Sequence, residues 1–258
     1  MSVNPVSDAS SPRAQPAEIR PPSPGQVAAL LEWARCQKPA LFCYLRLAAS
    51  IGARRSQLLA LRWGDVDWER GAISSTRGLA VGPGGLELRP PKNHRTYRAE
   101  LDSETFAALK EHRSIAEAEA REAGVEIADG SFVFSRFVDG ARPWLPHWTS
   151  SQFGTARRAA GLAHFRLYDL RHFMATQMLA AGVPIVTVSQ RLSHARVSTT
   201  LNAYAHSVPG GDRKAAEALA AILAAGRQGQ DDPARGQADG DSGPKHAQSP
   251  EVPSAAAR

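Results

Sequence analysis

Two arginines and one tyrosine have the side chains best suited to chemistry on a phosphate ester. They are Arg54, Arg171 and Tyr204. A guanidinium group is planar and permanently charged, so it can bond two phosphate oxygens while negative charge builds on them. A tyrosine hydroxyl has an ordinary pKa of about 10, so it becomes a nucleophile only beside cations and a proton acceptor. These residue types would suit attack by the Tyr204 oxygen on a phosphodiester.

Two further hydrogen-bond donors lie near these residues in the sequence. Lys92 follows Pro91, and His194 precedes Tyr204 by ten residues. When charged, both side chains donate hydrogen bonds, which suits a departing alkoxide or an anionic phosphate. Five of the 31 lysine and arginine residues are lysines, so a lysine at position 92 is less readily explained by random substitution.

Each of these five residues also has an ordinary structural explanation. Arg54 and Arg171 suit solvated helix positions, and Lys92 in a hairpin turn would protect a strand edge. Tyr204 has the helical spacing of a core residue, and His194 suits the C-terminal end of a helix. These separate explanations predict nothing about the order and spacing of the set. The ordered set therefore favours a joint chemical role.

Four segments carry the set, and in order and spacing they resemble the tyrosine recombinase (phage integrase) family. The family pattern has an arginine in Gly-x-Arg-x-x-Glu-Leu, a lysine in a β-hairpin, His-x-x-Arg, a Leu-Gly-His turn and a nucleophilic tyrosine. The resemblance covers about residues 21–225. The matching segments are Gly52-Ala53-Arg54-Arg55-Ser56-Gln57-Leu58, Pro91-Lys92, Tyr168-Asp169-Leu170-Arg171-His172, and Leu192-Ser193-His194 followed by Tyr204.

The resemblance implies a site-specific DNA recombinase or integrase that cuts and rejoins DNA through a 3′-phosphotyrosyl intermediate on Tyr204. Arg54 and Arg171 would hold the phosphate, Lys92 would protonate the departing 5′-oxygen, and His194 would hydrogen-bond the phosphate. The implied partner is double-stranded DNA, bound by a homo-tetramer on paired sites. The phosphotyrosine conserves the bond energy, so the resemblance implies no ATP, no metal and no other cofactor.

The sequence departs from the family pattern at three positions. Tyr168 stands where the family usually has histidine, and a neutral phenol is a poor proton acceptor that can still donate a hydrogen bond to phosphate. Because Tyr168 and Arg171 are three apart in an expected helix, both could reach one phosphate. Gln57 replaces a glutamate and loses a charge that would help to hold an arginine. Ser193 replaces a glycine and must adopt its backbone angle.

A second hypothesis stays open beside the enzyme. Family members usually carry an N-terminal helical domain, whereas about 20 residues precede the expected domain here. A catalytically impaired or truncated integrase remnant would then act only as a DNA-binding protein.

Overall charge favours a polyanionic partner. The 258 residues carry a formal net charge of +6 and a pI of about 9.7, which gives a positive field around the fold. Four arginines are candidates for DNA contacts, with solvated surface charges as the alternative for each. They are Arg95, Arg98, Arg191 and Arg196.

Local patterns predict a mainly helical α+β domain at residues 21–226 between disordered ends at 1–20 and 227–258. Ser23-Pro24 is typical of a helix start. One three-stranded antiparallel sheet is expected from residues 72–81, 86–88 and 97–101, and a short strand from 132–134. Further helices are expected at residues 41–50, 54–61, 103–123, 150–160, 167–181, 184–192, 198–206 and 213–225.

The two cysteines, Cys36 and Cys43, are expected to pack as small apolar residues, without a disulfide or zinc site. The four histidines His94, His147, His164 and His206 lack metal-ligand spacing. The sequence has no apolar signal core and no run long enough to span a membrane. We therefore expect a cytoplasmic protein that does not contact membranes.

Overall fold

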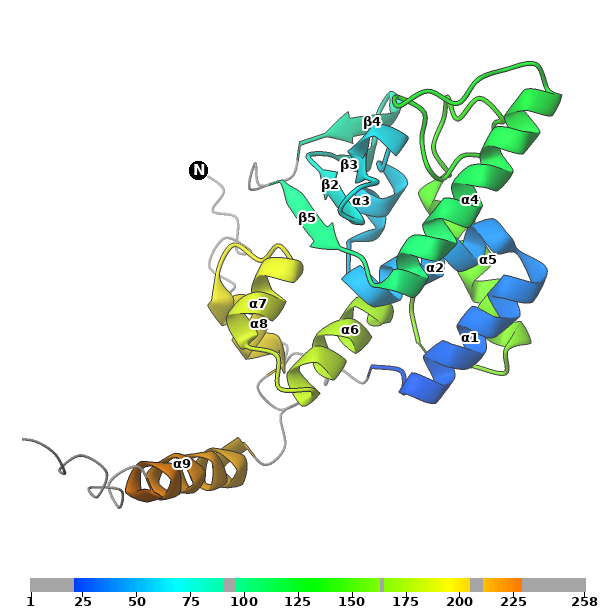
Figure 1. Cartoon of the computed structure of the whole chain (residues 1–258). Helices are drawn as coiled ribbons and strands as arrows, with labels where there is room; N and C mark the ends of the chain where they lie inside the picture. Colours follow the sequence, from blue (N-terminus) through cyan, green and yellow to red (C-terminus); the bar gives the residue numbers. More distant parts are fainter. Residues whose placement is uncertain (1–20, 91–95, 163–164, 205–210, 229–258) are drawn as a thin grey trace, which may run out of the picture. The chain divides into compact units, whose positions relative to one another are not determined.

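The computed structural model describes residues 21–90, 96–162, 165–204 and 211–228 (Figure 1). The chain divides into two compact units, residues 1–209 and 210–258. Of the segments expected to be disordered, 1–20 and residues 229–258 of 227–258 lie outside the described residues, whereas residues 227 and 228 belong to a helix. Within the described residues, the second unit consists of a single helix, α9 (Gly211–Gln228). The domain boundary predicted at residue 226 stays a prediction.

Helix α1 (Pro24–Gln37) begins as its sequence predicts. The Ser23 hydroxyl accepts a hydrogen bond from the Gln26 amide at 3.3 Å, and the Gln26 side chain accepts one from the Ser23 amide at 2.9 Å. This capping box satisfies two backbone donors that a helix start leaves free. Pro24 at the first helical position needs no donor partner. The reciprocal cap explains why the helix begins at this residue.

Helix α2 (Pro39–Ile51) is the centre of the main hydrophobic core. It packs against α1, against α4 (Ser103–Glu122) and against α6 (Asp169–Ala180) (Figure 1). Four of its side chains are completely buried, namely Tyr44, Leu45, Leu47 and Ile51. The Tyr44 ring lies edge-on to Phe134, with centroids 5.1 Å apart. Because α2 touches three helices, its C-terminal end is held rigidly.

Two small sheets form where one was expected. The three-stranded sheet has the order β1-β2-β5, from Val66–Asp67, Ala72–Ser75 and Tyr97–Glu100, all antiparallel. The strands β3 (Gly78–Gly82) and β4 (Gly85–Arg89) form a separate hairpin. Residues 86–88 therefore do not join the three-stranded sheet, so that prediction of its membership was wrong.

The expected strand over residues 72–81 breaks because a side chain competes with the sheet ladder. The Ser75 hydroxyl accepts from the Arg77 amide at 3.4 Å and donates to the Arg77 carbonyl at 3.3 Å. Such local bonds offer the backbone an alternative to strand pairing. The third strand of the larger sheet is instead Val66–Asp67, outside the strands expected from the sequence. Helix α3 (Arg55–Leu59) and a short 3-10 turn, η1 (Trp63–Asp65), precede it.

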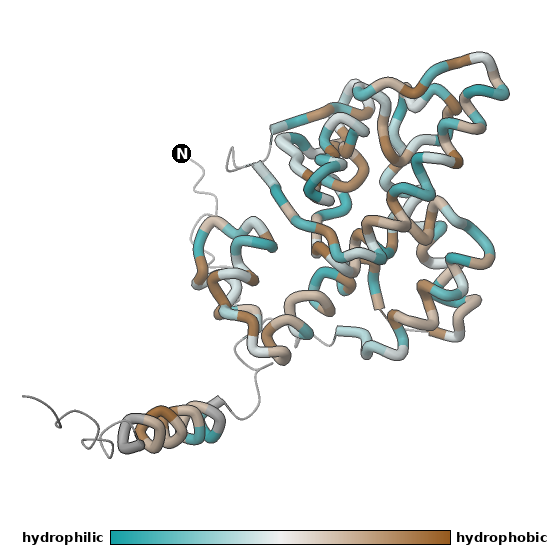
Figure 2. Tube along the Cα trace, in the orientation of Figure 1, coloured by the Kyte–Doolittle hydropathy of each residue, from teal (hydrophilic) through white to brown (hydrophobic). Residues whose placement is uncertain are grey.

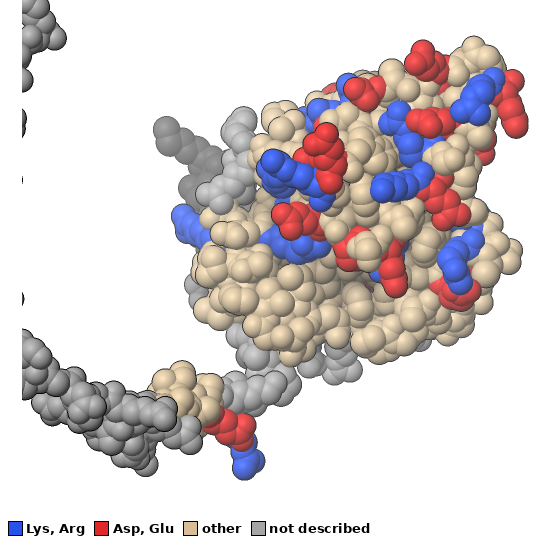
Figure 3. Space-filling model, viewed as in Figure 1, with Lys and Arg blue, Asp and Glu red and all other residues tan. Residues whose placement is uncertain are grey.

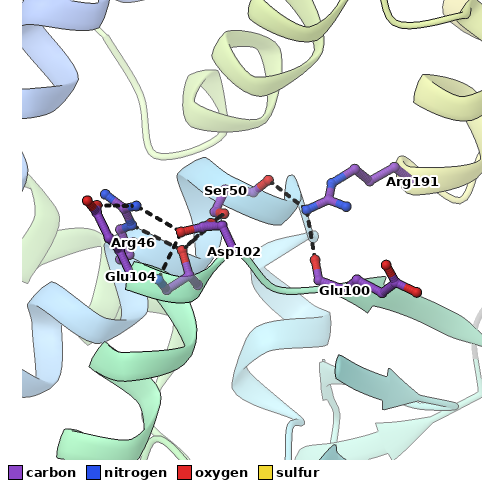
Figure 4. A network of polar contacts seen from close by, with 7 residues as sticks. Arg46, Ser50, Glu100, Asp102, Glu104 and Arg191 are labelled. Atoms are coloured by element: carbon purple, nitrogen blue, oxygen red, sulfur yellow. Dashed lines mark hydrogen bonds and ion pairs between the residues drawn. The ribbon is translucent and has the colours of Figure 1, made fainter. Parts of the chain in front are cut away.

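Helix α4 is capped by Asp102, directly before the start predicted at residue 103. The Asp102 carboxylate accepts from the Thr105 amide at 3.0 Å, and it also binds Arg46 and Ser50 (Figure 4). A carboxylate is a good N-cap because it accepts hydrogen bonds from the free amides and its negative charge is attracted to the positive end of the helix dipole. This cap joins the start of α4 to α2.

Two further local predictions were wrong. Cys36, expected to pack as a small apolar residue, is exposed, whereas Cys43 is buried as predicted. Residues 132–134 form an isolated bridge between Arg62 and Phe132 instead of a strand. A short apolar run cannot by itself specify whether a neighbouring strand is available to pair.

The remaining helices of the first unit are α5 (Pro146–Ala159), α6, α7 (Ile185–Arg191) and α8 (Val197–Tyr204). Three of them, α6, α7 and α8, build the surroundings of Tyr204. Tyr204 packs with Met174 and Leu179 of α6 and with Val188 of α7 in a second apolar cluster. Figure 1 shows α7 and α8 beside α6. This cluster fixes α8 against α6.

Helix α9 is amphipathic and exposes its apolar side chains. Leu219, Ile222 and Leu223 are all more than half exposed. Figure 2 shows hydrophilic residues at the start of α9 and hydrophobic ones farther along it. In the described part of the chain, no helix combines the length and apolar character that crossing a lipid bilayer requires.

Candidate active site

Arg171 joins three segments that are far apart in the sequence. Its guanidinium donates to the Gly52 carbonyl, to the Leu192 carbonyl at 2.5 Å and to His194 Nε2 at 3.0 Å. The side chain is 2% exposed, so the alternative of a solvated surface arginine is wrong. Charge-assisted bonds from one planar group to three acceptors fix its orientation. Arg171 therefore sets the positions of the turns around it.

A glycine at the end of α2 makes this convergence possible. Gly52 ends the helix in the left-handed conformation, with φ of 63°. A Cβ atom there would lie 2.2 Å from the Met174 methyl carbon, which no other residue type could tolerate without a shift. The turn also presents the Gly52 carbonyl to Arg171.

Gln57 anchors the backbone of Arg54. Its side-chain oxygen accepts from the Arg54 amide at 2.9 Å, and the Gln57 side chain is buried. Arg54 therefore starts α3 in a fixed extended conformation, with its side chain half-buried. Glutamine makes this hydrogen bond without the charge that the family's glutamate would bring.

Arg54, Tyr168 and Arg171 line one cavity of about 410 Å³. Among the described residues around the cavity, three are arginines and none is acidic. Burial, together with the neighbouring charge of Arg54, lowers the pKa of Arg171. An anion between the two guanidinium groups would relieve this repulsion. The cavity has the electrostatics of a phosphate site, and the predicted proximity of Tyr168 and Arg171 is consistent with it.

Tyr204 is buried and bonded to a histidine that the sequence patterns did not single out. Its hydroxyl lies 2.7 Å from Nδ1 of His172, and the side chain is 2% exposed. Burial raises the pKa of Tyr204 to about 12. The only sequence signal for His172 was its place directly after Arg171, and helical spacing alone does not say that it faces α8.

His194 is held between Arg171 and α8. Its Nε2 accepts from Arg171, which can only donate, so Nδ1 carries the proton and donates to the Thr200 hydroxyl at 2.8 Å. Burial and the charges of Arg171 and Arg54 lower the pKa of His194 to about 4. In the free protein His194 is therefore neutral, and its Nε2 is occupied as an acceptor.

The turn before His194 has the strained backbone that the sequence implies. Ser193 has a φ of 51°, the only positive φ among described residues other than glycine. The residue thus adopts the conformation that the family's glycine would take at lower cost.

The other candidate residues are dispersed. Lys92 and Arg95 lie outside the described residues. Arg98 and Arg196 are exposed, and their DNA contacts stay predictions. Arg191 donates to the backbone carbonyls of Ser50 and Glu100 at 3.2 and 3.0 Å (Figure 4). Its guanidinium therefore ties α7 to α2 and β5 in the free protein.

Charge on the visible face of the first unit is mixed. In Figure 3, Lys and Arg residues lie among Asp and Glu residues, and neither sign dominates. The described residues hold no group of three His, Cys, Asp or Glu side chains close enough to bind a metal ion. The visible face thus carries both signs of charge, whereas the charged residues that line the cavity are all arginines.

The sequence matches the phage integrase family over residues 23–210. The chain belongs to that family. It is 27% identical over 193 residues to a tyrosine recombinase XerC-like protein of Caldanaerobacter subterraneus, covering 67% of this chain and 47% of that protein. The 258-residue chain matches about half the length of these curated relatives.

Solved structures share the fold. The Tn1549 transposon integrase in complex with a circular intermediate DNA superposes with a TM-score of 0.66 at 21% identity, covering 80% of this chain and 68% of that one. The catalytic domain of the bacteriophage HP1 integrase has a TM-score of 0.53 at 18% identity, covering 78% of this chain and 95% of that one. The predicted α+β fold, mainly helical with small antiparallel sheets, is confirmed.

Proposed function

We propose that this family member cuts and rejoins double-stranded DNA at specific sites, with Tyr204 as the nucleophile. The observation that carries the proposal is the cavity in which Arg54 and Arg171 lie together without an acidic neighbour among the described lining residues. Two fixed guanidinium groups stabilise the charge that develops on a phosphate during attack. His172 next to Arg171 brings the Tyr204 hydroxyl to the same helix.

The proposed reaction exchanges one phosphoester for another. The Tyr204 oxygen attacks phosphorus, the bond to the 5′-oxygen breaks, and the 3′-phosphate stays on the tyrosine. Lys92 would protonate the departing oxygen, and Tyr168 would hydrogen-bond the phosphate. His194 would do so once its Nε2, which accepts from Arg171 in the free protein, releases Arg171 and takes up a proton beside the bound anion. The reverse step, with a 5′-hydroxyl as the nucleophile, rejoins DNA. Because the phosphotyrosyl bond conserves the energy of the phosphodiester, neither ATP nor a metal ion enters this scheme.

Tyr204 must become accessible for this reaction. In the free protein it is buried in the cluster formed by α6, α7 and α8. We propose that DNA binding shifts α8 enough for the hydroxyl to reach the phosphate held by the two arginines while it stays within hydrogen-bond reach of His172. The buried, neutral tyrosine would also limit side reactions of the free protein.

We further propose that four protomers act on two duplexes. Helix α9 exposes Leu219, Ile222 and Leu223, which would gain stability by burial against another surface. Docking on a neighbouring protomer would hold a tetramer together, whereas packing on its own chain would leave a monomer. Removal of residues 210–258 should therefore abolish DNA-dependent tetramers in sedimentation experiments.

A trapping experiment tests the proposed activity. The probe is a pool of nicked duplexes with randomised sequence beside the nick, so that the cut fragment diffuses away and leaves a covalent adduct. Wild-type protein should give adducts that survive denaturation, and sequencing the adducts should reveal the preferred site. DNA binding should weaken as salt concentration rises, because binding releases counterions.

Matched tyrosine variants identify the nucleophile. Tyr204→Phe should bind DNA nearly as well as wild type but form no adduct. Tyr44→Phe also removes a buried hydroxyl, one at the wall of the same cavity and without a hydrogen-bond partner in the described residues, and it should keep its adduct yield because Tyr44 is not the proposed nucleophile. Binding without any wild-type adduct would instead favour a non-catalytic DNA-binding protein. Equal adduct yield from Tyr204→Phe would exclude Tyr204 as the nucleophile.

A further inference from the structure

We propose that His172 is the catalytic base that accepts the proton of Tyr204, a role for which the phenol of Tyr168 is chemically unsuited. This inference rests on the DNA cleavage proposed above. The direct observation is the distance of 2.7 Å between His172 Nδ1 and the Tyr204 hydroxyl oxygen. A general base must lie within hydrogen-bond reach of the proton it takes, and this pair already does.

Helix α6 separates the phosphate-binding group from the base. Arg171 and His172 are consecutive, so their side chains point roughly 100° apart around the helix. Arg171 faces the Gly52 turn and the Leu192 carbonyl, whereas His172 faces α8. Tyr168 lies one turn earlier with its ring edge-on to His172, with centroids 5.0 Å apart, and is 48% exposed. One helix thus places the anion site and the base beside the same nucleophile.

The imidazole has the protonation state that a base requires. Burial lowers the pKa of His172, and the charges of Arg171 and Arg166 act in the same direction, against the opposing charge of Asp169. The other ionisable groups near it are Tyr168 and Tyr204, with His194 close enough to interact with it. Near neutral pH the ring is therefore uncharged. Its Nδ1 can accept the hydroxyl proton, and Nε2 then carries the ring hydrogen.

The proton transfer balances the phosphoester exchange. As the Tyr204 oxygen forms its bond to phosphorus, its proton moves to Nδ1 and His172 becomes an imidazolium. The 5′-oxygen leaves with a proton from the separate donor. During rejoining, the imidazolium returns its proton to the tyrosine oxygen as the phosphotyrosyl bond breaks. The base is thereby restored at the end of the cycle.

The rate of adduct formation tests the role of His172. The substrate is a nicked duplex carrying a site recovered from wild-type adducts, at saturating concentration and pH 7.5. His172→Asn keeps a hydrogen-bond acceptor but no basic nitrogen, and its rate should fall roughly 100-fold or more. Its DNA affinity should stay within about threefold of wild type, because the arginines remain in place. His147→Asn, at an exposed histidine, should react at the wild-type rate.

Two readouts separate a base from a residue that only packs against Tyr204. Wild-type rates should fall on acidification below about 6.5, the ordinary histidine pKa, and this decline should vanish in His172→Asn. In His172→Ala, added imidazole should restore adduct formation in proportion to its neutral form. Loss of rate with the acid decline retained and no rescue would mean a packing role and overturn the inference.

The wild-type protein alone provides a test if the variants fold poorly. The midpoint of the acid decline should equal the titration midpoint of His172 measured by NMR in the DNA complex. A different midpoint would overturn the inference. A wild-type rate in folded His172→Asn would overturn it while leaving the proposed cleavage intact. If wild type forms no adduct at all, the proposed function itself fails, and the inference with it.

Discussion

Three acceptors from two turns that are far apart in the sequence converge on the guanidinium of Arg171. They are the Gly52 carbonyl after α2, and the Leu192 carbonyl and the His194 ring in the turn between α7 and α8. A buried charge is costly unless hydrogen bonds satisfy it, and these bonds do so while leaving the group at the cavity wall. The same side chain therefore supports the local fold and places positive charge at the cavity wall.

Arg171→Lys should separate charge from geometry. An ammonium group cannot bridge the three acceptors, so some buried carbonyls would lose their donor. We expect adduct formation to fall more than about 100-fold and the free energy of unfolding to fall by about 1–3 kcal/mol. Trapping assays and urea denaturation measure the two effects. Arg98→Lys, at an exposed strand position, is the control for stability. Wild-type adduct rates in Arg171→Lys would show that charge alone suffices.

At the scale of elements, short turns position the site residues. The turn between α7 and α8 carries both Leu192, whose carbonyl binds Arg171, and His194, which binds Thr200 of α8. Arg191 ties the end of α7 to α2 and β5 (Figure 4). Because the turn is held at both ends, its backbone strain at Ser193 persists in the fold.

Ser193→Gly should relieve that strain. A residue with a Cβ atom at φ of 51° is disfavoured in the left-handed region, whereas glycine is not. Part of the gain is offset by the larger entropy of glycine in the unfolded chain, so we expect stabilisation of about 0.5–1 kcal/mol. Calorimetry should show a Tm higher by about 1–4 °C. Ser193→Ala, which keeps the Cβ atom, should not raise the Tm. A lower Tm for Ser193→Gly would contradict the strain argument.

At the scale of the whole molecule, three histidines are kept neutral by burial. They are His112, His172 and His194, and the pKa of each lies below its ordinary value, with His194 at about 4. A lowered pKa means that the unfolded chain binds protons more readily than the folded one below about pH 6.5. Stability from these groups is therefore present above that pH and lost as pH falls toward 4.

The free energy of unfolding should consequently be lower at pH 5.5 than at pH 7.5. We expect a difference of about 1 kcal/mol from His194, allowing for solvent screening of a half-buried group. Urea denaturation at both pH values measures it. His194→Gln should reduce the difference, whereas His147→Gln, at an exposed position, should leave it unchanged. Equal or greater stability at pH 5.5 would contradict neutral burial of these rings.

Local signals in the sequence were enough for the start of α1 and for the family. Ser23 and Pro24 predicted the start of α1, which the capping bonds confirm. The order of Arg54, Arg171 and Tyr204 predicted the family, which the match over residues 23–210 confirms. Both depend on residue types at short or fixed spacing, which a sequence displays directly.

Tertiary structure alone decided which strands pair and which side chains meet. Val66 and Ile73 pair in a sheet from which residues 86–88 are absent, because pairing depends on partners elsewhere in the chain. His172 meets Tyr204 only because α8 packs on α6. The types of the residues proposed to react are therefore read directly from the sequence, whereas the burial of Tyr204 and its hydrogen bond to His172 arise from contacts between distant segments.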